Sequence, residues 1–265
     1  MGADSYTIVG LGEILWDLFP GRKELGGAPA NFAYMTNLLG DRAKIISRVG
    51  KDALGAEAIQ VLRSLDLDIS HLQKDDLHPT GTVIVSLNSE GQPEYEITKQ
   101  VAWDFLQQTG DWKTLAREAD AVCFGSLAQR STVSGEAILA FLHRLKPAAL
   151  RVFDVNLRQK FFTRETLDQS ARSADIVKCN HEEVVIVARL LGCAAEDMNE
   201  SAQNLLRAYH LKLLCVTRGE HGSILLSPTG NHAHPGYRVK VVDTVGAGDA
   251  FTAGLVHHYV RGSSL

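Results

Sequence analysis

The feature that most constrains the fold is a regular alternation of short apolar runs with longer amphipathic stretches. Runs typical of buried strands stand near residues 121–125, 150–155, 175–179 and 213–217. Stretches with helical periodicity follow them, near residues 134–145, 164–173, 181–191 and 200–209. Two parallel strands need a crossover connection between them, which is usually a helix. The alternation therefore predicts an α/β domain with a mostly parallel central sheet covered by helices.

The first quarter of the chain shows the same pattern. Tyr6–Gly10 and Ala43–Val49 are typical of strands, and helices are expected from Ala30 to Leu39 and from about Ala53 to Leu65. With 265 residues, the chain can bury a sizeable core as one large domain with a small appendage. We therefore expect a single domain over residues 1–265.

One region breaks the alternation. Thr82–Leu87 and Glu94–Thr98 are typical of strands, and the turn-rich residues 88–93 join them. Ile14–Phe19 is a further strand, closed by the turn residues Pro20 and Gly21. These segments, from about 14–25 and 81–99, predict a small antiparallel sheet outside the main sheet. The alternative is a hairpin on the edge of the main sheet.

Composition and charge exclude several classes of protein. The net charge of −4 argues against a nucleic-acid or membrane-surface partner, and no apolar run reaches the length of a membrane span. The first four residues do not begin a signal peptide. The four cysteines lack metal-site or redox spacing, so we expect reduced thiols in a cytoplasmic protein.

The common nucleotide-binding fingerprints are absent from the sequence. Gly10 and Gly12 follow a strand, but Leu15 stands where the dinucleotide motif needs a third glycine. Gly50 and Lys51 are followed by Asp52, so there is no Walker-type loop. A nucleotide site must be built in another way.

The most informative stretch for function is Asp243–Phe251, with the sequence DTVGAGDAF. The alternating residues Tyr237–Val241 predict a strand before it, and apolar residues from Ala250 onward predict a buried helix after it. Gly246, Ala247 and Gly248 then lie at a helix start, where backbone N–H groups and the helix dipole favour an anion.

An acid at Asp249 repels a phosphate and is unexpected in a simple anion site. It is useful if the carboxylate accepts a proton from a hydroxyl while the amides hold a transferred phosphoryl group. The alternative is a glycine-rich helix start with a first-turn acid that the dipole favours. Spacing alone does not choose between these two interpretations.

The stretch from Asp243 to Asp249 resembles the C-terminal signature of the ribokinase-like (pfkB-type) carbohydrate kinases. A second signature of that family, Gly-Gly followed by Asn-x-Ala, is matched far upstream over residues 26–33. The resemblance covers nearly the whole chain. It implies a three-layer sandwich with a mostly parallel sheet, a small β lid over the sugar, and transfer of a phosphoryl group from ATP with Mg²⁺.

The resemblance also implies roles for particular residues. Asp249 would be the base, and the amides of Gly246, Ala247 and Gly248 would stabilise the transferring phosphoryl group. The sugar-binding residues would be Asp17, Gly26, Gly27, Asn31 and Arg158. Without the resemblance, Asp17 could equally be an outward-facing strand residue, and Asn31 an ordinary residue near a helix start.

Arg158 belongs to a run that ends the strand at 150–155. Period-two alternation would place Asp154, Asn156 and Arg158 on one side, at the carboxyl end of the strand where ligands bind in open α/β sheets. We therefore expect these three polar groups to converge. The alternative is that these residues form a solvated strand end with no role in binding.

The nucleotide side is less specific in sequence. By resemblance, Asn180 and Glu183 serve the phosphates and a hydrated Mg²⁺, although Asn three residues before Glu also fits a capping box. Thr217, Gly219 and Gly222 would lie along ATP, and a tight turn would explain both glycines equally well.

Three further expectations come from the resemblance. Asp243 and Val245 match positions of a monovalent-cation loop, so K⁺ is a candidate ion. The lid is a candidate homodimer contact. The chain ends at Leu265, soon after the helix begun near Asp249, whereas relatives continue for a further helical segment that covers the adenine. We therefore expect a family segment to be missing from this sequence, and weak ATP binding without it.

The expected activity is that of an ATP-dependent fructokinase. The preference for fructose rests on residues 26–31, on Ala102–Asp104 and on Asn156–Arg158, which resemble the fructokinase branch. The alternatives are a 2-keto-3-deoxygluconate kinase or a ribokinase. A sugar-binding regulator without turnover is the alternative from another class.

Overall fold

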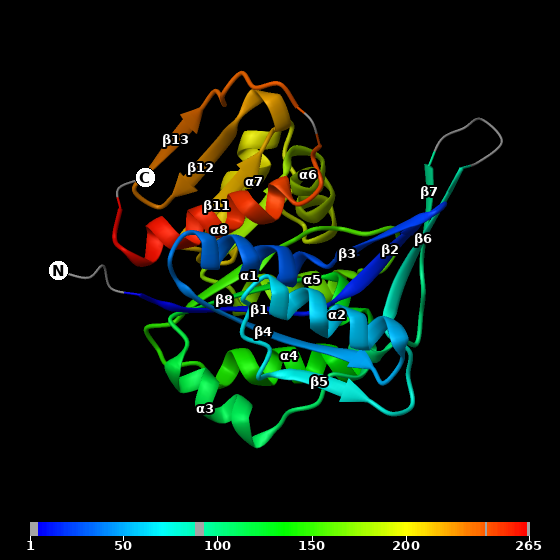
Figure 1. Ribbon diagram of the computed structural model, residues 1–265. Helices are drawn as coiled ribbons and strands as arrows, with labels where there is room; N and C mark the ends of the chain where they lie inside the picture. The colour runs from blue at the N-terminus through cyan, green and yellow to red at the C-terminus, as the bar shows by residue number, and fades with distance from the viewer. Residues whose placement is uncertain (1–4, 88–92, 242, 264–265) are drawn as a thin grey trace.

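The computed structural model describes residues 5–87, 93–241 and 243–263. A nine-stranded sheet forms its centre, in the order β13-β12-β11-β10-β9-β8-β1-β4-β5 (Figure 1). The strands are β1 Thr7–Leu11, β4 Arg42–Gly50, β5 Leu72–Asp75, β8 Ala121–Gly125, β9 Leu150–Asp154, β10 Ile176–Asn180, β11 Leu213–Thr217, β12 Ser223–Ser227 and β13 Gly230–His234. Neighbours from β11 to β5 pair in parallel, and β12 and β13 add antiparallel pairs at one edge. The predicted mostly parallel α/β sheet is confirmed.

Helices cover both faces of the sheet, which makes three layers. One face carries α1 Ala28–Leu38, α2 Ala53–Ser64 and α8 Ala247–Val260. The other carries α3 Gly110–Glu118, α4 Thr132–Arg144, α5 Arg164–Ser173, α6 His181–Leu190 and α7 Met198–Ala208. Successive strand residues point to opposite layers: Ile8 of β1 packs with Phe32 of α1, and Val9 belongs to the cluster on the other face.

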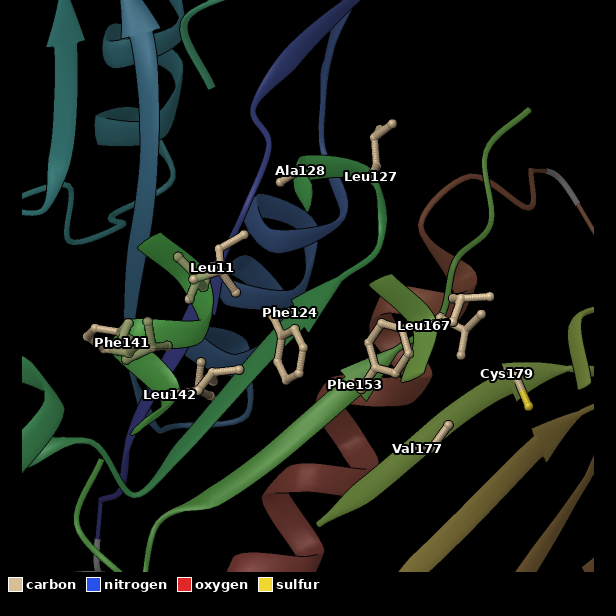
Figure 2. Packing of buried hydrophobic residues seen from close by; sticks show 14 of the residues in the cluster. Leu11, Phe124, Leu127, Ala128, Phe141, Leu142, Phe153, Leu167, Val177 and Cys179 are labelled. Atoms are coloured by element: carbon tan, nitrogen blue, oxygen red, sulfur yellow. The ribbon is translucent and has the colours of Figure 1, made fainter. Parts of the chain in front are cut away.

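The larger of the cores lies under α3–α7 (Figure 2). Phe124 of β8 and Phe153 of β9 stack side by side with ring centroids 5.3 Å apart. Phe141 of α4 is fully buried and meets the Trp112 ring edge-on. Each such side chain contributes about 1.5–3 kcal/mol by leaving water. This packing makes the sheet a rigid base for the loops at its carboxyl edge.

A second sheet of four strands stands apart from the first and extends away from it (Figure 1). Its order is β3-β2-β6-β7, with β2 Leu15–Phe19, β3 Arg22–Gly26, β6 Gly81–Leu87 and β7 Pro93–Ile97. The outer pairs are antiparallel, and the central pair of β2 and β6 is parallel. The separate sheet is confirmed, and the edge-hairpin alternative is wrong. Of the expected turn at 88–93, residues 88–92 lie outside the described part of the chain.

The segment before α8 differs from expectation. Residues 237–241 form no strand, and Tyr237, Val239 and Val241 are exposed. Their alternating pattern fits an extended solvated segment as well as a strand, because no neighbouring strand pairs with it in the described structure. Helix α8 is also less enclosed than expected. It buries Thr252, Ala253 and Val256 on one face and leaves most other positions half-buried.

The four cysteines are confirmed as buried free thiols: Cys123, Cys179, Cys193 and Cys215. Burial in apolar surroundings raises the pKa of each thiol, which keeps it protonated and unreactive. Within the described residues, no helix is both long enough and apolar enough to cross a bilayer.

Candidate active site

Helix α8 begins at the carboxyl edge of the parallel sheet, and its first turn meets the first turn of α1. Asn31 of α1 donates a hydrogen bond from Nδ2 to Oδ2 of Asp249, at 2.8 Å. Two signatures separated by 218 residues are thus joined by direct contact. The predicted base and one predicted sugar-binding residue lie together.

Asp249 is placed to exchange a proton. Its side chain is largely buried, and burial raises the pKa of the carboxyl to about 6. The hydrogen bond from Asn31 and the charges of Lys178 and Arg158 lower the pKa, and Asp154 raises it. A base with a pKa just below neutrality is ionised at pH 7 and still accepts a proton readily.

The start of α8 is open to an approaching anion. Gly246 caps the helix with φ 72°, a left-handed conformation that favours glycine. The first-turn N–H groups of a helix have no partner within the helix. Of these, the N–H of Ala247 donates to the carbonyl of Thr244, at 3.2 Å. The amides at the helix start remain suited to a phosphoryl group, although that of Ala247 would have to exchange its bond.

A buried ion pair, which was not predicted from the sequence, supports this first turn from below. Lys178 of β10 holds Asp154 of β9, with Nζ 3.1 and 3.2 Å from the two carboxylate oxygens. Thr252 of α8 donates to the same Asp154 at 2.8 Å. Burial lowers the pKa of Lys178, but Asp154, together with the charges of Glu183 and Asp249, outweighs this effect and raises it. The ammonium group lies 3.1 Å from where a Cβ on Gly248 would stand, so positive charge underlies the helix start.

On the side of the site that faces the small sheet, the carboxyl group of Asp17 lies beside two glycines. Asp17 of β2 directs its Oδ2 at Gly26 of β3, 2.6 Å from where a Cβ on Gly26 would stand. Gly27 has φ 113°, and a Cβ there would collide with the backbone carbonyl of Glu13. Burial, followed by repulsion from Glu24, raises the pKa of Asp17, and Arg158 lowers it. The two glycines therefore let the Asp17 carboxylate and the Glu13 backbone approach this part of the chain closely.

Glu13 was not among the predicted residues. It follows β1 in the loop to β2, its side chain is only 3% exposed, and its Oε2 has no hydrogen-bond partner. Burial raises the pKa of this carboxyl to about 7, against the effect of backbone amides and of Arg158. A carboxylate between two apolar runs at the carboxyl end of a strand is the signal that could have found it.

The expected convergence of residues 154, 156 and 158 is wrong. Strand β9 ends at Asp154, and Asn156 has φ 41°, so the period-two alternation stops before Asn156. Asp154 turns inward to Lys178, whereas Arg158 is exposed. Arg158 nevertheless stays near the predicted site, because its charge lowers the pKa of Asp17, Glu13 and Asp249.

Asn180 and Glu183 form the capping box at the start of α6. Oδ1 of Asn180 accepts from the N–H groups of Glu182 and Glu183, each at 2.9 Å. Glu183 Oε2 accepts from the N–H of Asn180 at 2.9 Å, and Oε1 accepts from the N–H of Leu157 at 2.8 Å. The capping interpretation is confirmed. The carboxylate of Glu183 is thereby fixed at the sheet edge with 7% exposure.

The remaining nucleotide candidates lie next to this box. Thr217 ends β11 and pairs in register with Asn180 at the end of β10. Gly219 and Gly222 have φ 58° and 77° in the turn to β12. A Cβ on Gly222 would collide with the backbone at His234 and Gly236, so a structural need for that glycine is sufficient. The candidates thus fall into two groups, one at β10 and β11 and one at the lid, with α8 between them.

The described residues contain no cluster of three or more acidic, histidine or cysteine side chains that could hold a metal ion directly. Asp243 accepts a hydrogen bond from the N–H of Val245 at 2.9 Å, and both residues are exposed. Mg²⁺ usually keeps several waters and few protein ligands, so a single carboxylate such as Glu183 fits a water-mediated role.

Ala102–Asp104 lies outside this constellation. Trp103 is fully buried, and Asp104 binds Arg130 with both oxygens at 2.8 Å. The guanidinium of Arg130 lies 4.0 Å from the centre of the Trp103 ring. These contacts fix the segment that follows β7, at the base of the small sheet.

Comparison with known proteins agrees with this arrangement. The model of the pfkB family of carbohydrate kinases matches residues 18–265. A fructokinase of Escherichia coli is 32% identical over 237 residues, which cover 87% of this chain and 75% of that protein.

Two solved structures of the fructokinase of Vibrio cholerae O395 also resemble the chain. The apo form has a TM-score of 0.83 and 28% identity, covering 97% of this chain and 90% of that one. A double mutant with fructose, ADP and potassium ion bound has a TM-score of 0.82 and 27% identity, covering 97% and 84%. With both signatures joined at one site and the family model matched over most of its length, this chain belongs to the pfkB family of carbohydrate kinases, which transfer a phosphoryl group to a sugar hydroxyl.

Proposed function

We propose that the chain is an ATP-dependent fructokinase that converts D-fructose and ATP to fructose 6-phosphate and ADP. The observation that carries the proposal is the carboxyl of Asp249, held by Asn31 at the start of α8 with a pKa of about 6. The choice of fructose is supported by the similarity to the fructokinases of Escherichia coli and Vibrio cholerae.

In the proposed reaction, Asp249 accepts the proton of the sugar hydroxyl as that oxygen attacks the terminal phosphoryl group. Base catalysis of this kind contributes about 10²–10⁴-fold to the rate. The amides of Gly246, Ala247 and Gly248 face the charge on the transferred group, and the buried Lys178 adds positive charge behind Gly248.

We propose that Asp17, Gly26, Gly27, Asn31 and Arg158 bind the sugar. A carboxylate can accept two hydrogen bonds from neighbouring hydroxyl groups, and Asp17 lies in the small sheet beside the two glycines. Asp17 belongs to the small sheet, whereas Asp249 lies in α8, which covers the nine-stranded sheet. A bound sugar would therefore contact both parts of the molecule. Closure of the small sheet would then exclude water, which otherwise competes as the phosphoryl acceptor.

On the nucleotide side, we propose that Asn180, Thr217, Gly219 and Gly222 lie along ATP. Glu183 would hold Mg²⁺ through water. The ion, when bound, neutralises phosphate charge. Asp243 and Val245 are proposed for a monovalent cation such as K⁺. Support for that ion comes from the Vibrio cholerae variant solved with potassium.

A coupled assay of ADP release tests the proposal. It would compare fructose, ribose, 2-keto-3-deoxygluconate, glucose and a nucleoside at saturating MgATP. The expected result is the highest kcat/KM with fructose. A higher value with 2-keto-3-deoxygluconate or ribose would reassign the substrate within the family.

The second candidate function is that of a sugar-binding regulator, which would bind fructose and release no ADP. The raised pKa of Asp249 favours the enzyme, because a pure binding protein needs no proton acceptor at an anion site. Calorimetric binding of fructose without any ADP release would favour the regulator.

We further propose that residues 1–265 act as one kinase domain in the cytoplasm, and that the outer face of the small sheet forms a homodimer contact. Exposed Ile84 on that sheet supports the last point. Sedimentation of the wild-type protein and of an Ile84→Lys variant would test it.

A further inference from the structure

Glu13 is the buried acid of the site that the proposed reaction does not use. It lies at the carboxyl end of β1, and its backbone carbonyl is close to Gly27 at the start of α1. The backbone amide of Ala28, the first residue of α1, faces its carboxyl and stabilises its charged form. The side chain thus sits below the helix that carries Asn31.

The charged and titrating groups around Glu13 come from three other elements. Arg158, after β9, is the positive group, and Asp249 of α8 is the negative one. Cys123 of β8 is the third, and burial raises its thiol pKa so far that it stays neutral. The neighbouring site adds Asp17, Asp154 and Lys178, so four carboxyl groups share two cationic side chains, Arg158 and Lys178. A site that must accept the phosphates of ATP already carries an excess of acid.

One carboxyl oxygen of Glu13 lacks a hydrogen-bond donor, although backbone amides stabilise the other. Its Oε2 is shielded from solvent and has no hydrogen-bond partner. An ionised carboxylate has about four acceptor positions to satisfy, whereas a protonated carboxyl group has fewer. Leaving a charged oxygen buried and unpaired is costly, and the group can avoid that cost by keeping its proton. The surroundings therefore favour neutral Glu13.

We propose that Glu13 is a positioning residue that works in its protonated form, so that Asp249 carries the charge of the pair while the site accepts the phosphoryl group. The proposal rests on the kinase function above and deepens it. The pKa values agree in direction, with Asp249 at about 6 and Glu13 at about 7. Two interacting carboxyl groups titrate as a pair. Where their environments push the two pKa values apart, the group with the lower pKa acts as the base and the other holds the proton.

When Glu13 loses its proton, a second negative charge appears behind Asp249. Like charge near the phosphate position weakens binding of the anionic nucleotide and favours proton return to Asp249. The expected consequence is a loss of kcat/KM for MgATP above about pH 7 that depends on Glu13. Glu13→Gln, a neutral residue of the same shape, would remove this loss.

The first measurement needs no turnover. Infrared difference spectra of wild-type protein and of Glu13→Gln, recorded between about pH 6 and pH 8, would show the carbonyl stretch of a protonated carboxyl. A band that disappears as pH rises and is absent in Glu13→Gln supports the proposal. A wild-type protein without this band at pH 6 would overturn it, whatever the enzyme phosphorylates.

The second measurement compares pH profiles of kcat/KM for MgATP. The ratio of wild type to Glu13→Gln cancels the titration of the nucleotide itself. This ratio should fall by about tenfold through the alkaline range, the size expected for two like charges roughly 12 Å apart at an effective dielectric of about 20. Glu13→Asp should keep the fall, and the exposed Glu118→Gln on α3 should match wild type.

A constant ratio across the range would overturn the inference. If Glu13→Gln does not fold, the Glu13→Asp profile and the wild-type infrared band still decide. If no sugar supports turnover, the proposed function fails, and the infrared band together with MgADP affinity against pH still tests Glu13.

Discussion

Two regions of this protein bury carboxyl groups and treat them in opposite ways. Asp75, at the end of β5, is 1% exposed, yet its pKa is lowered to about 2. Burial alone would raise that pKa, but hydrogen bonds from the amides of Leu77 and His78, the His78 ring and the charge of Arg48 outweigh it. Glu13, equally buried, has a pKa raised to about 7.

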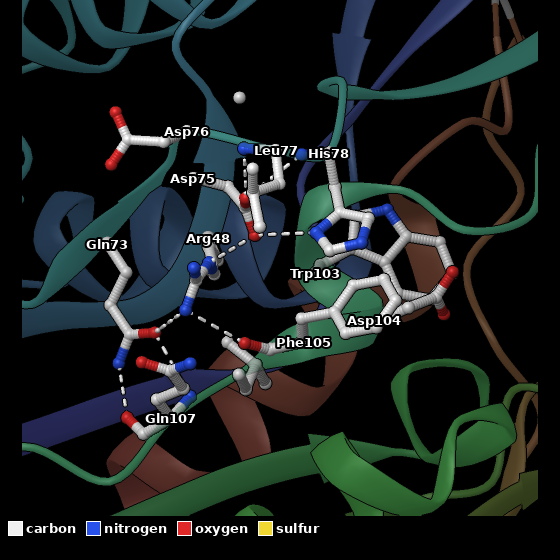
Figure 3. Close-up of polar contacts among 12 residues, drawn as sticks. Arg48, Gln73, Asp75, Asp76, Leu77, His78, Trp103, Asp104, Phe105 and Gln107 are labelled. Carbon is white, nitrogen blue, oxygen red and sulfur yellow. Dashed lines mark hydrogen bonds and ion pairs between the residues drawn. The ribbon is translucent and has the colours of Figure 1, made fainter.

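The difference lies in the donors supplied. Around Asp75, the amides of Leu77 and His78 donate at 2.8 and 2.9 Å, the His78 ring lies at 3.2 Å, and Arg48 forms an ion pair at 2.7 Å (Figure 3). Arg48 also donates to the carbonyl of Phe105, and the His78 ring stacks on Phe105. In the active site, Glu13 Oε2 has no partner and Asp249 has Asn31. A buried carboxylate with several donors and a cation beside it stays ionised and stabilises the fold. One with few donors has a raised pKa and can exchange protons.

The largest effect is expected for Asp249→Asn. Removing the proton acceptor should lower kcat by about 10²–10⁴-fold, because the amide cannot take the hydroxyl proton. Steady-state ADP release with fructose measures this, and calorimetry should show sugar binding retained. Asp75→Asn is the matched control and should keep most of the wild-type kcat. A variant at Asp249 with near-normal turnover would contradict the assignment.

Lys178→Met tests whether the buried pair under α8 is structural. Loss of the ammonium leaves Asp154 buried without its cation, and breaking such a pair costs about 3–5 kcal/mol. We expect the free energy of unfolding in urea to fall by that amount. The double variant with Asp154→Leu should recover part of the loss. No change in the single variant would show that this ion pair does not stabilise the fold.

Asp17→Ala should weaken fructose binding about tenfold or more, since a hydrogen bond to a charged group contributes about 1.5–3 kcal/mol. The affinity for MgADP should stay within a small factor, because Asp17 lies on the lid side. Titration calorimetry with each ligand separates the two effects. Equal loss for both ligands would argue for damage to the fold.

The smallest effect is expected from Asp75→Asn on acid stability. A carboxyl with a lowered folded pKa stabilises the protein above its unfolded value of 3.8, and this is lost as pH falls through about 2. The variant should be destabilised by about 1–3 kcal/mol at neutral pH through donors left unpaired. It should also lose the part of the wild-type stability decline between about pH 4 and 2 that Asp75 causes. Urea unfolding at several pH values checks both.

The sequence predicts the part of this molecule that periodicity controls. The strands at 121–125 and 213–217 agree in full with the structure, because a buried parallel strand is a short apolar run between turns. Tyr237–Val241 shows the limit of that signal. Its alternation is correct for a strand, but pairing depends on a neighbour that the local sequence does not describe.

Site residues followed the same division. Asn31 and Asp249 were predicted from motifs, and the structure brings them into contact. Glu13 and Lys178 were missed because each is a single charge beside or within an apolar run. What gives them chemical significance is the lack of a donor at Glu13 Oε2 and the presence of Asp154 beside Lys178. Both facts arise from tertiary contacts.

The contact between α1 and α8 has a consequence for synthesis on the ribosome. Translation adds about 5–20 residues per second, so roughly 10–40 s separate the emergence of Asn31 from that of Asp249. Throughout that interval the sheet face under α8 has no cover from Ala253 and Val256, which later pack beside Phe32. The nascent chain therefore exposes an apolar surface until α8 emerges. Cells that make this protein quickly would gain most from chaperones that shelter that surface.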